Sequence, residues 1–189
     1  MLFRSLEPRL SYDATQVVFS HVAVAETPID PASLAVNEEG PDEAYFHVYT
    51  LGSDGTGLRQ LTTGTYDDVM PTWLPDGGVA FCSTRRQAYS RCFGGQFSKR
   101  WDSYTIYRMA VDGSALRQLS WNDVNEWFPE VSNAGTLIFA RWDYIDRDAV
   151  THQNLWSMRP DGTNQMAIWG NATPNPHCAF QAKAIPDSG

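Results

Sequence analysis

The sequence contains little lysine and has no long apolar run. Only Lys99 and Lys183 are lysines among its 14 basic residues, and 22 acidic residues bring the net charge to −8. A chain without clustered cations cannot replace the counterions of a nucleic acid, so nucleic-acid binding is not expected. No apolar stretch approaches the roughly 20 residues of a membrane-spanning helix. Insertion into a membrane is therefore not expected either.

Signals for export and for covalent cofactors are also missing. The first residues, Met1–Glu7, do not form the apolar core of a secretion signal, so either the protein is cytoplasmic or the chain lacks its leader. Three cysteines are too few for a disulfide scaffold and fit no zinc-finger spacing. There is no Cys-x-x-Cys-His sequence for attaching haem. We expect no cofactor in this chain, and haem or metal only together with other domains.

What the sequence does contain is a tandem repeat. One motif carries an Asp-Gly pair at 54, 112 and 161, and it spans Leu51–Thr62, Ala110–Ser120 and, more loosely, Met158–Met166. A second motif alternates with it and begins with proline, at Pro8–Phe19, Pro71–Phe81 and Pro129–Phe139. Asp-Gly between two short apolar runs is typical of a hairpin turn, because glycine adopts positive φ without penalty. Each repeat therefore predicts strand, turn, strand, loop, strand, turn and strand.

Four short antiparallel strands that recur every 50 or so residues predict an all-β fold, the β-propeller, with four-stranded blades. The blades are expected at about 6–62, 69–120 and 127–170, with the start of a fourth at about 176–189. A solenoid of β-hairpins is the alternative, but the long apolar stripe of a stacked β-helix is missing. Three blades cannot close a ring of the usual four to eight. Either the chain belongs to a longer polypeptide, or two copies complete a six-bladed ring through their open blade edges.

The repeat resembles those of the periplasmic protein of the Tol system. More specifically, the chain is similar to the middle domain of the hydrazine synthase alpha subunit over nearly its whole length. The stretches that carry this resemblance are Phe81–Arg86, Arg141–Arg147, Leu155–Thr163 and Ala182–Pro186. The Arg-Trp-Asp-Tyr block at Arg141, joined to the Trp-Ser-Met-Arg-Pro-Asp-Gly strand, is its most specific part.

The resemblance implies a propeller in an exported protein, periplasmic or extracellular. In hydrazine synthase the chemistry belongs to haems held partly by flanking domains, and this chain lacks the haem-attachment motif. The resemblance therefore favours a non-catalytic binding or scaffolding module. Its partner would be another domain, a protein subunit or a small ligand at the propeller mouth. The alternative is an accessory domain of a haem- or metal-dependent multidomain enzyme.

Segments that interrupt the repeat are the candidate binding sites. Arg141, Trp142, Tyr144 and Asp146 combine cations, acids and aromatic faces that could recognise a carboxylate, a sugar or a peptide, and His152 follows in the same loop. The competing interpretation is an Arg–Asp network that locks one blade to the next.

A second interruption contains five cations, at Arg85, Arg86, Arg91, Lys99 and Arg100. They could bind an anionic ligand or a partner surface, and the competing interpretation is a solvated loop.

The cysteines and paired acids are weaker candidates. Cys82 and Cys92 could close a disulfide if the chain is exported, and would be free thiols otherwise. A metal site could form only from Cys92 and a distant histidine, so metal ligands remain unassigned. The adjacent Asp67 and Asp68 precede a blade-opening strand, where aspartate usually caps a turn. We therefore predict no catalytic residue. Trp73, Tyr107 and Trp156 are expected to pack between blades.

Overall fold

The computed structural model describes residues 2–24, 45–88, 103–142, 153–170, 175–176, 178–186 and 188. This part of the chain forms twelve strands and no helix. The strands are β1 (Leu2–Leu10), β2 (Gln16–Val24), β3 (His47–Gly52), β4 (Arg59–Gln60), β5 (Asp68–Trp73), β6 (Val79–Ser83), β7 (Thr105–Met109), β8 (Arg117–Gln118), β9 (Glu126–Val131), β10 (Leu137–Trp142), β11 (Gln153–Met158) and β12 (Met166–Trp169). Among these residues no helix is present that could cross a membrane.

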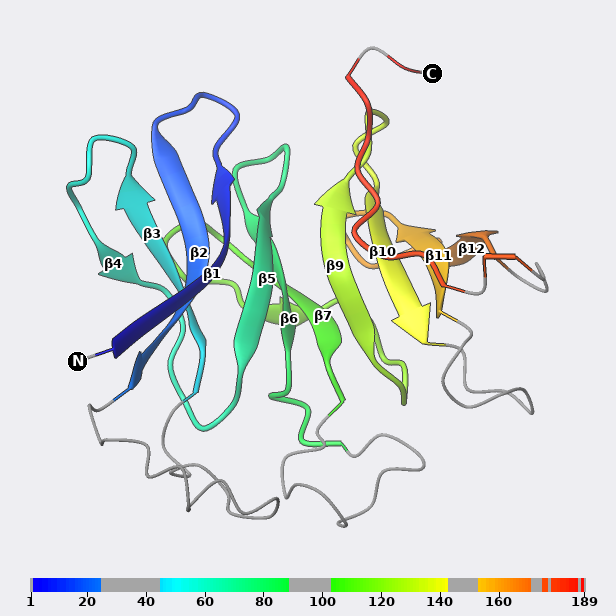
Figure 1. Ribbon diagram of the computed structural model, residues 1–189, viewed down its shortest axis with the longest axis horizontal. Helices are drawn as coiled ribbons and strands as arrows, with labels where there is room; N and C mark the ends of the chain where they lie inside the picture. The colour runs from blue at the N-terminus through cyan, green and yellow to red at the C-terminus, as the bar shows by residue number, and fades with distance from the viewer. Residues whose placement is uncertain are drawn as a thin grey trace.

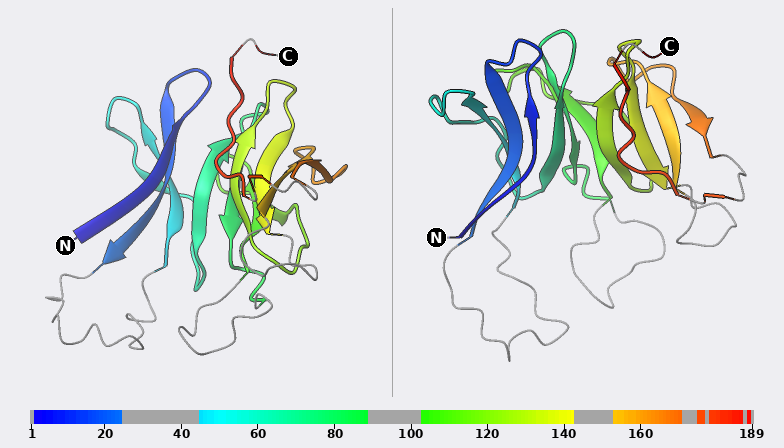
Figure 2. Two further views of the ribbon diagram at one scale, coloured as in Figure 1. Left: turned by 45° about the vertical axis from the view of Figure 1, so that its right-hand side comes forward. Right: turned by 45° about the horizontal axis from the view of Figure 1, so that its top comes forward.

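The strands form three four-stranded antiparallel sheets, each in chain order: β1–β4, β5–β8 and β9–β12. The sheets stand side by side, with β1, β5 and β9 as neighbouring first strands (Figure 1). The turned views keep this order (Figure 2). The all-β propeller architecture that the repeat predicts is confirmed. The last strands β4 and β8 have only two residues each, shorter than the apolar runs around them suggest.

The Asp-Gly turns share one geometry. The Oδ1 atoms of Asp54, Asp112 and Asp161 accept the backbone N–H of the Thr or Ser two residues later, at 2.9 Å in all three turns. The same Oδ1 atoms also accept that residue's hydroxyl. The glycine that follows each aspartate has φ between 82° and 88°. A repeated local sequence has produced the same turn three times, because all of its bonds lie within a few residues.

The first strand of each sheet carries a bulge at the same repeat position. Glu7, Met70 and Phe128, each directly before a proline, have φ of 54° to 56°, and the strand register shifts beside them. Gln181 has φ of 51° at the corresponding place further along the chain. The N–H of Ser188 then bonds the carbonyl of Ile185, as the N–H of Gly77 bonds that of Leu74. Residues 178–186 thus repeat the positive-φ residue and the turn bond of a first strand, although they form only an isolated bridge, between Cys178 and Gln153.

The core lies between the sheets, not within one sandwich. One cluster joins the first and second sheets, and it consists of Val18, Val48, Trp73, Val79, Phe81, Tyr107 and Met109. The other joins the second and third sheets, and it consists of Val69, Leu74, Ala80, Cys82, Ile106, Leu119, Leu137, Phe139 and Met158, with Trp156 packed against it. Packing of Trp73, Tyr107 and Trp156 between blades is therefore confirmed.

The first sheet is less covered than the other two. Phe81 and Phe139 are 0% and 1% exposed, whereas their counterpart Phe19 is only half-buried. Among the described residues, the first sheet packs against another sheet on one side only, the side of Val18 and Val48.

Candidate functional site

Polar side chains occupy one register position at the same end of each sheet. We call these three rows the polar rungs. The cross-strand partners are Ser5, His21 and His47 in the first sheet, Asp68, Ser83 and Thr105 in the second, and Glu126, Arg141 and Asn154 in the third. A polar row at one level of a propeller is the natural place to look for chemistry, since apolar residues fill the levels above it.

In the second rung a buried carboxylate accepts hydrogen bonds from two side chains. Asp68 is 0% exposed and accepts two bonds from Arg85, at 2.6 Å from Nη2 and 3.2 Å from Nε. Ser83 donates its hydroxyl to the same carboxylate at 2.6 Å. The guanidinium of Arg85 also lies 4.6 Å from the ring centre of Tyr66. Such a bidentate, stacked arginine is well suited to holding one carboxylate in place.

The third rung repeats this arrangement with different residues. Glu126 is 0% exposed and accepts from Arg141, whose Nε lies 2.8 Å and Nη2 2.6 Å from Oε1. Arg141 stacks over Trp156 at 4.1 Å. Burial raises the pKa of Glu126, and the charge of Arg141 opposes that rise. The carboxylate is thus costly to bury and depends on its arginine.

The third rung also connects neighbouring sheets. Ser120, just after β8 in the second sheet, donates its hydroxyl to Glu126. The side chain of Gln165 accepts from Arg141 at 2.6 Å and donates to the carbonyl of Leu119 at 3.1 Å. In the described residues Arg141 therefore belongs to a network that bridges two blades, with Glu126 as its acid.

Those predicted site residues that the structure describes do not gather into one open site. Trp142 is 5% exposed and Arg141 8% exposed, so neither presents a surface to a ligand. Arg85 is paired inside the second rung and is not part of a solvated loop, while Arg86 donates to the carbonyl of Asn122.

Several predicted residues lie outside the described part of the chain: Tyr144, Asp146, His152, Arg91, Cys92, Lys99 and Arg100.

The proposed disulfide is not formed by Cys82. This residue carries a free thiol, is 0% exposed and lies in the core between the second and third sheets. A disulfide would require its partner to enter that core, because a central strand holds the thiol there. Burial raises the pKa of the Cys82 thiol, so it is also a poor nucleophile. The described residues contain no group of three or more His, Cys, Asp or Glu placed to hold a metal ion.

An accessible site lies instead at the opposite end of the first strands, where the short turns meet. We call it the turn-end mouth. Tyr12 is 69% exposed and stands between two hollows of about 320 and 640 Å³, which both include Tyr12 and Pro75 in their lining. The larger hollow reaches the turn at Ser132 to Gly135 in the third sheet. Partial desolvation, and secondarily the charge of Glu130, raises the pKa of Tyr12 above its ordinary value of 10. Its hydroxyl is a neutral donor at physiological pH.

An ion pair underlies this mouth. Arg9 and Glu130 lie 3.2 Å apart, with side chains 29% and 22% exposed. Sequence reasoning missed them, together with Tyr12. A signal was present, because Arg9, Thr72 and Glu130 each follow the proline of the second motif. One position per blade, occupied in turn by a cation, a neutral residue and an acid, would have pointed to the centre of the ring.

Solved structures with the same fold include several propeller proteins. A putative TolB from Agrobacterium tumefaciens matches with a TM-score of 0.57 at 21% identity, over 87% of this chain and 50% of that one. Hydrazine synthase from Kuenenia stuttgartiensis matches with a TM-score of 0.66 at 12% identity, over 90% of this chain and 26% of that one. A puromycin hydrolase matches with a TM-score of 0.56 at 16% identity, over 88% and 22%.

The chain thus spans half or less of the length of these proteins. No protein-family model matches it, and no curated protein sequence does. Three radially arranged four-stranded sheets and these structural neighbours define the chain as a β-propeller module, with the fold found in TolB and hydrazine synthase. At these identities the likeness concerns the fold.

Proposed function

We propose that this chain is a non-catalytic binding module of an exported bacterial protein, and that it binds its partner at the turn-end mouth. The observation that carries the proposal is the contrast between the two ends of the sheets. At the rung end Asp68 and Glu126 are buried and paired with arginines, so these charges stabilise the fold and are not free to bind a ligand. At the turn end an exposed tyrosine stands between two hollows.

The mouth has the properties of a recognition surface. Tyrosine offers a large, rigid contact area with a polar tip, and it is enriched where proteins bind one another. Hollows of 320 and 640 Å³ are in the range that accommodates a side chain or a small ligand. The backbone beneath is held in place, because the indole N–H of Trp73 donates to the carbonyl of Arg9 at 3.0 Å. We therefore expect a peptide segment of a partner protein to lie across Tyr12.

Selection from a displayed library of random twelve-residue peptides tests this proposal. A selected peptide is synthesised and titrated calorimetrically into the wild-type chain, Tyr12→Ser and Leu58→Ser. Leu58 is a matched control, because it is 65% exposed against 69% for Tyr12 and lies before the outer strand β4. We expect at least tenfold weaker binding for Tyr12→Ser alone. Equal loss in both variants, or in neither, contradicts the mouth as the binding site.

The exported location rests on the resemblance to the periplasmic Tol protein and on the TolB neighbours. Fractionation of the source cells, with an antibody against this chain, tests it. Detection in the periplasm or the medium supports export, and confinement to the cytoplasm contradicts it.

A second candidate function is supported by one observation, the match to hydrazine synthase over 90% of this chain. In that case the module would be an accessory domain of a haem- or metal-dependent enzyme. The coding sequence on either side of this chain separates the two. Flanking Cys-x-x-Cys-His motifs would favour the accessory domain, and their absence would favour the binding module.

A further inference from the structure

The two contacts between sheets pair the same two kinds of surface. The following sheet contributes an aromatic face, built on the cross-strand pair Phe81 and Tyr107 in the second sheet and Phe139 and Trp156 in the third. The preceding sheet contributes an aliphatic face. Its members are Val18, Val48 and Leu61 in the first sheet, and Ala80, Ile106 and Leu119 in the second. Each blade therefore carries one face of each kind.

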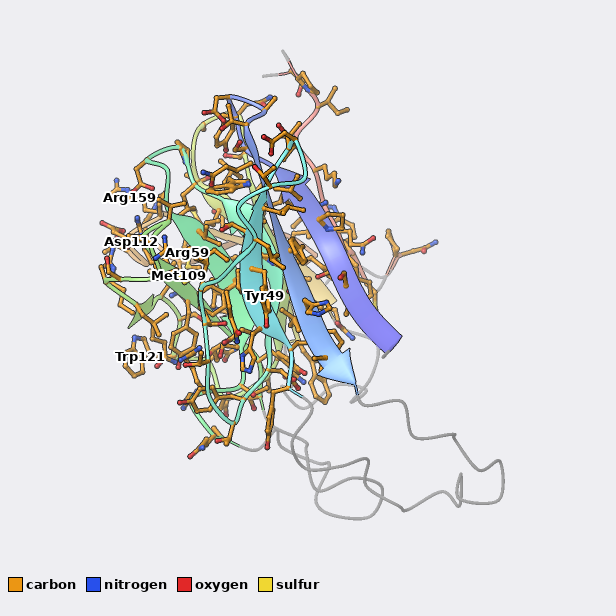
Figure 3. The ribbon with its side chains drawn as sticks, turned by 90° about the vertical axis from the view of Figure 1, so that its left-hand side faces the viewer. Tyr49, Arg59, Met109, Asp112, Trp121 and Arg159 are labelled. Carbon is orange, nitrogen blue, oxygen red and sulfur yellow. The ribbon has the colours of Figure 1, made fainter. Side chains whose placement is uncertain are left out.

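In the part of the chain that the structure describes, one face of each kind has no neighbouring sheet at the ends of the row. In the first sheet Phe19 and Tyr49 stack at 6.0 Å in the positions of Phe81 and Tyr107. Both are half-buried, and the side of the first sheet that carries Tyr49 faces the viewer in Figure 3. In the third sheet Ile168 is 46% exposed, while its counterpart Leu119 is 3% exposed.

We propose that a second copy of this chain docks head to tail, with its aliphatic third-sheet face on the aromatic first-sheet face. The chain forms this kind of contact twice internally, so the open faces continue an interface that the structure already shows. Each copy carries one face of each kind, and two identical contacts join six sheets, a number within the usual four to eight blades. This assembly does not depend on the ligand of the turn-end mouth.

Glycines in the Asp-Gly turns show how closely the sheets must approach. A Cβ added to Gly113 would lie 2.9 Å from the carbonyl oxygen of Leu61 in the preceding sheet, and one added to Gly162 would lie 2.7 Å from that of Leu119. The equivalent Gly55 has nothing within 4 Å of such a Cβ. In the assembly the carbonyl of Ile168 in the second copy takes the place of Leu61 and Leu119. A side chain at position 55 would then block docking.

Residues 178–186 partly occupy the docking face. Phe180 packs against Trp127 and Phe128, and the amide of Asn133 donates to the carbonyls of Ile185 and Ser188. This segment lies against β9 and the turn that follows it, where β1 of the second copy would lie. The two compete for one site, so removing residues 171–189 should strengthen docking.

Sedimentation velocity between 1 and 200 μM tests the proposal. We expect the full chain to change from 21.2 kDa to twice that mass with rising concentration, and the chain ending at Gly170 to do so at a tenfold lower concentration or less. Gly55→Ala should weaken association at least tenfold. Gly57→Ala is the matched control, because Gly57 lies in the same turn with φ of 69° and equally open space.

A second pair of variants tests the other face. Ile168→Glu should abolish association, and Leu116→Glu, which is 41% exposed on the middle sheet, should not. Thermal unfolding of each variant at 1 μM verifies that it is folded. A single 21.2-kDa species for both the full and the shortened chain would overturn the proposal. So would a dimer that tolerates Gly55→Ala and Ile168→Glu. Neither result would alter peptide binding at Tyr12.

Discussion

Arg9 in β1 and Glu130 in β9 form an ion pair at 3.2 Å, although the first strand of the second sheet lies between theirs. Both residues follow the proline of the repeat, as Thr72 does in β5. A contact that skips one blade is open only to side chains on the first strands, because these converge toward the axis while the outer strands diverge. The pair therefore marks the centre of the ring.

We expect this pair to contribute modestly to stability. Both side chains are partly solvated, so a double-mutant cycle with Arg9→Gln and Glu130→Gln should give a coupling free energy of about 0.5–1 kcal/mol. Screening by salt should reduce it. Urea unfolding of the four proteins at low salt and in 0.5 M NaCl measures both quantities. A coupling that stays constant with salt would contradict a solvated pair.

Arg141→Ala should destabilise the fold by about 3–5 kcal/mol, because it leaves the buried carboxylate of Glu126 without its cation. Glu126→Gln in the same chain should recover part of that loss, since a neutral amide is less costly to bury. Arg159→Ala, on an exposed turn, is the control. Thermal unfolding measures all three. An unchanged melting temperature together with lost peptide binding would instead assign Arg141 to the binding site.

The same variant should acquire a pH dependence. Burial raises the pKa of Glu126 above its ordinary value of 4.5, and Arg141→Ala removes the main opposing influence. A carboxyl whose pKa is higher in the folded state binds its proton more tightly there, so the folded state loses stability as pH rises above the unfolded value. The loss in free energy of unfolding caused by Arg141→Ala should therefore be larger at pH 8 than at pH 5. An equal deficit at both would show that Glu126 is not the cause.

Alanine in the Asp-Gly turns should distinguish strain from collision. Gly55, Gly113 and Gly162 have φ of 84°, 82° and 88°, so each substitution incurs a similar backbone strain of about 1–2 kcal/mol. Gly113→Ala and Gly162→Ala also meet a carbonyl oxygen of the preceding sheet, and Gly55→Ala does not. Urea unfolding at 1 μM should show a loss at least about 1 kcal/mol larger for these two. Equal losses of stability in all three variants would mean that neighbouring sheets move apart easily at the Asp-Gly turns.

The turn carboxylates should make the protein sensitive to acid. Hydrogen bonds from the following Thr or Ser lower the pKa of Asp54, Asp112 and Asp161 below the ordinary value of 3.8. Groups of this kind stabilise the fold above the unfolded pKa, and the contribution is lost as pH falls through the folded pKa. Asn at all three positions keeps the acceptor oxygen but cannot titrate. We expect its melting temperature to fall less between pH 5 and 2 than that of the wild type, and an identical fall would exclude these turns as the origin.

Much of the fold could be predicted from the sequence, because its main signals are local. The Asp54, Asp112 and Asp161 turns close within five residues, so a short motif specifies them wherever it occurs. The candidate site was much harder to predict from the sequence. For Arg85 the sequence left open an anionic-ligand site or a solvated loop, and for Arg141 a ligand site or an Arg–Asp network between blades. The burial of both arginines depends on the carboxylates of Asp68 and Glu126, which are 17 and 15 residues away. Cys82 read as one end of a disulfide loop, and the strand places its thiol in the core.

Strand order, turn type and the repeat of the blades were encoded within stretches of about ten residues, because backbone hydrogen bonds and glycine φ preferences act over that range. Only the packing of three twisted sheets against one another decided the rest. It decided which charges are paired, which aromatic faces are covered and where Arg9 meets Glu130. Those contacts join residues up to 121 positions apart. Their geometry depends on the angle between neighbouring sheets, which no local stretch of sequence specifies.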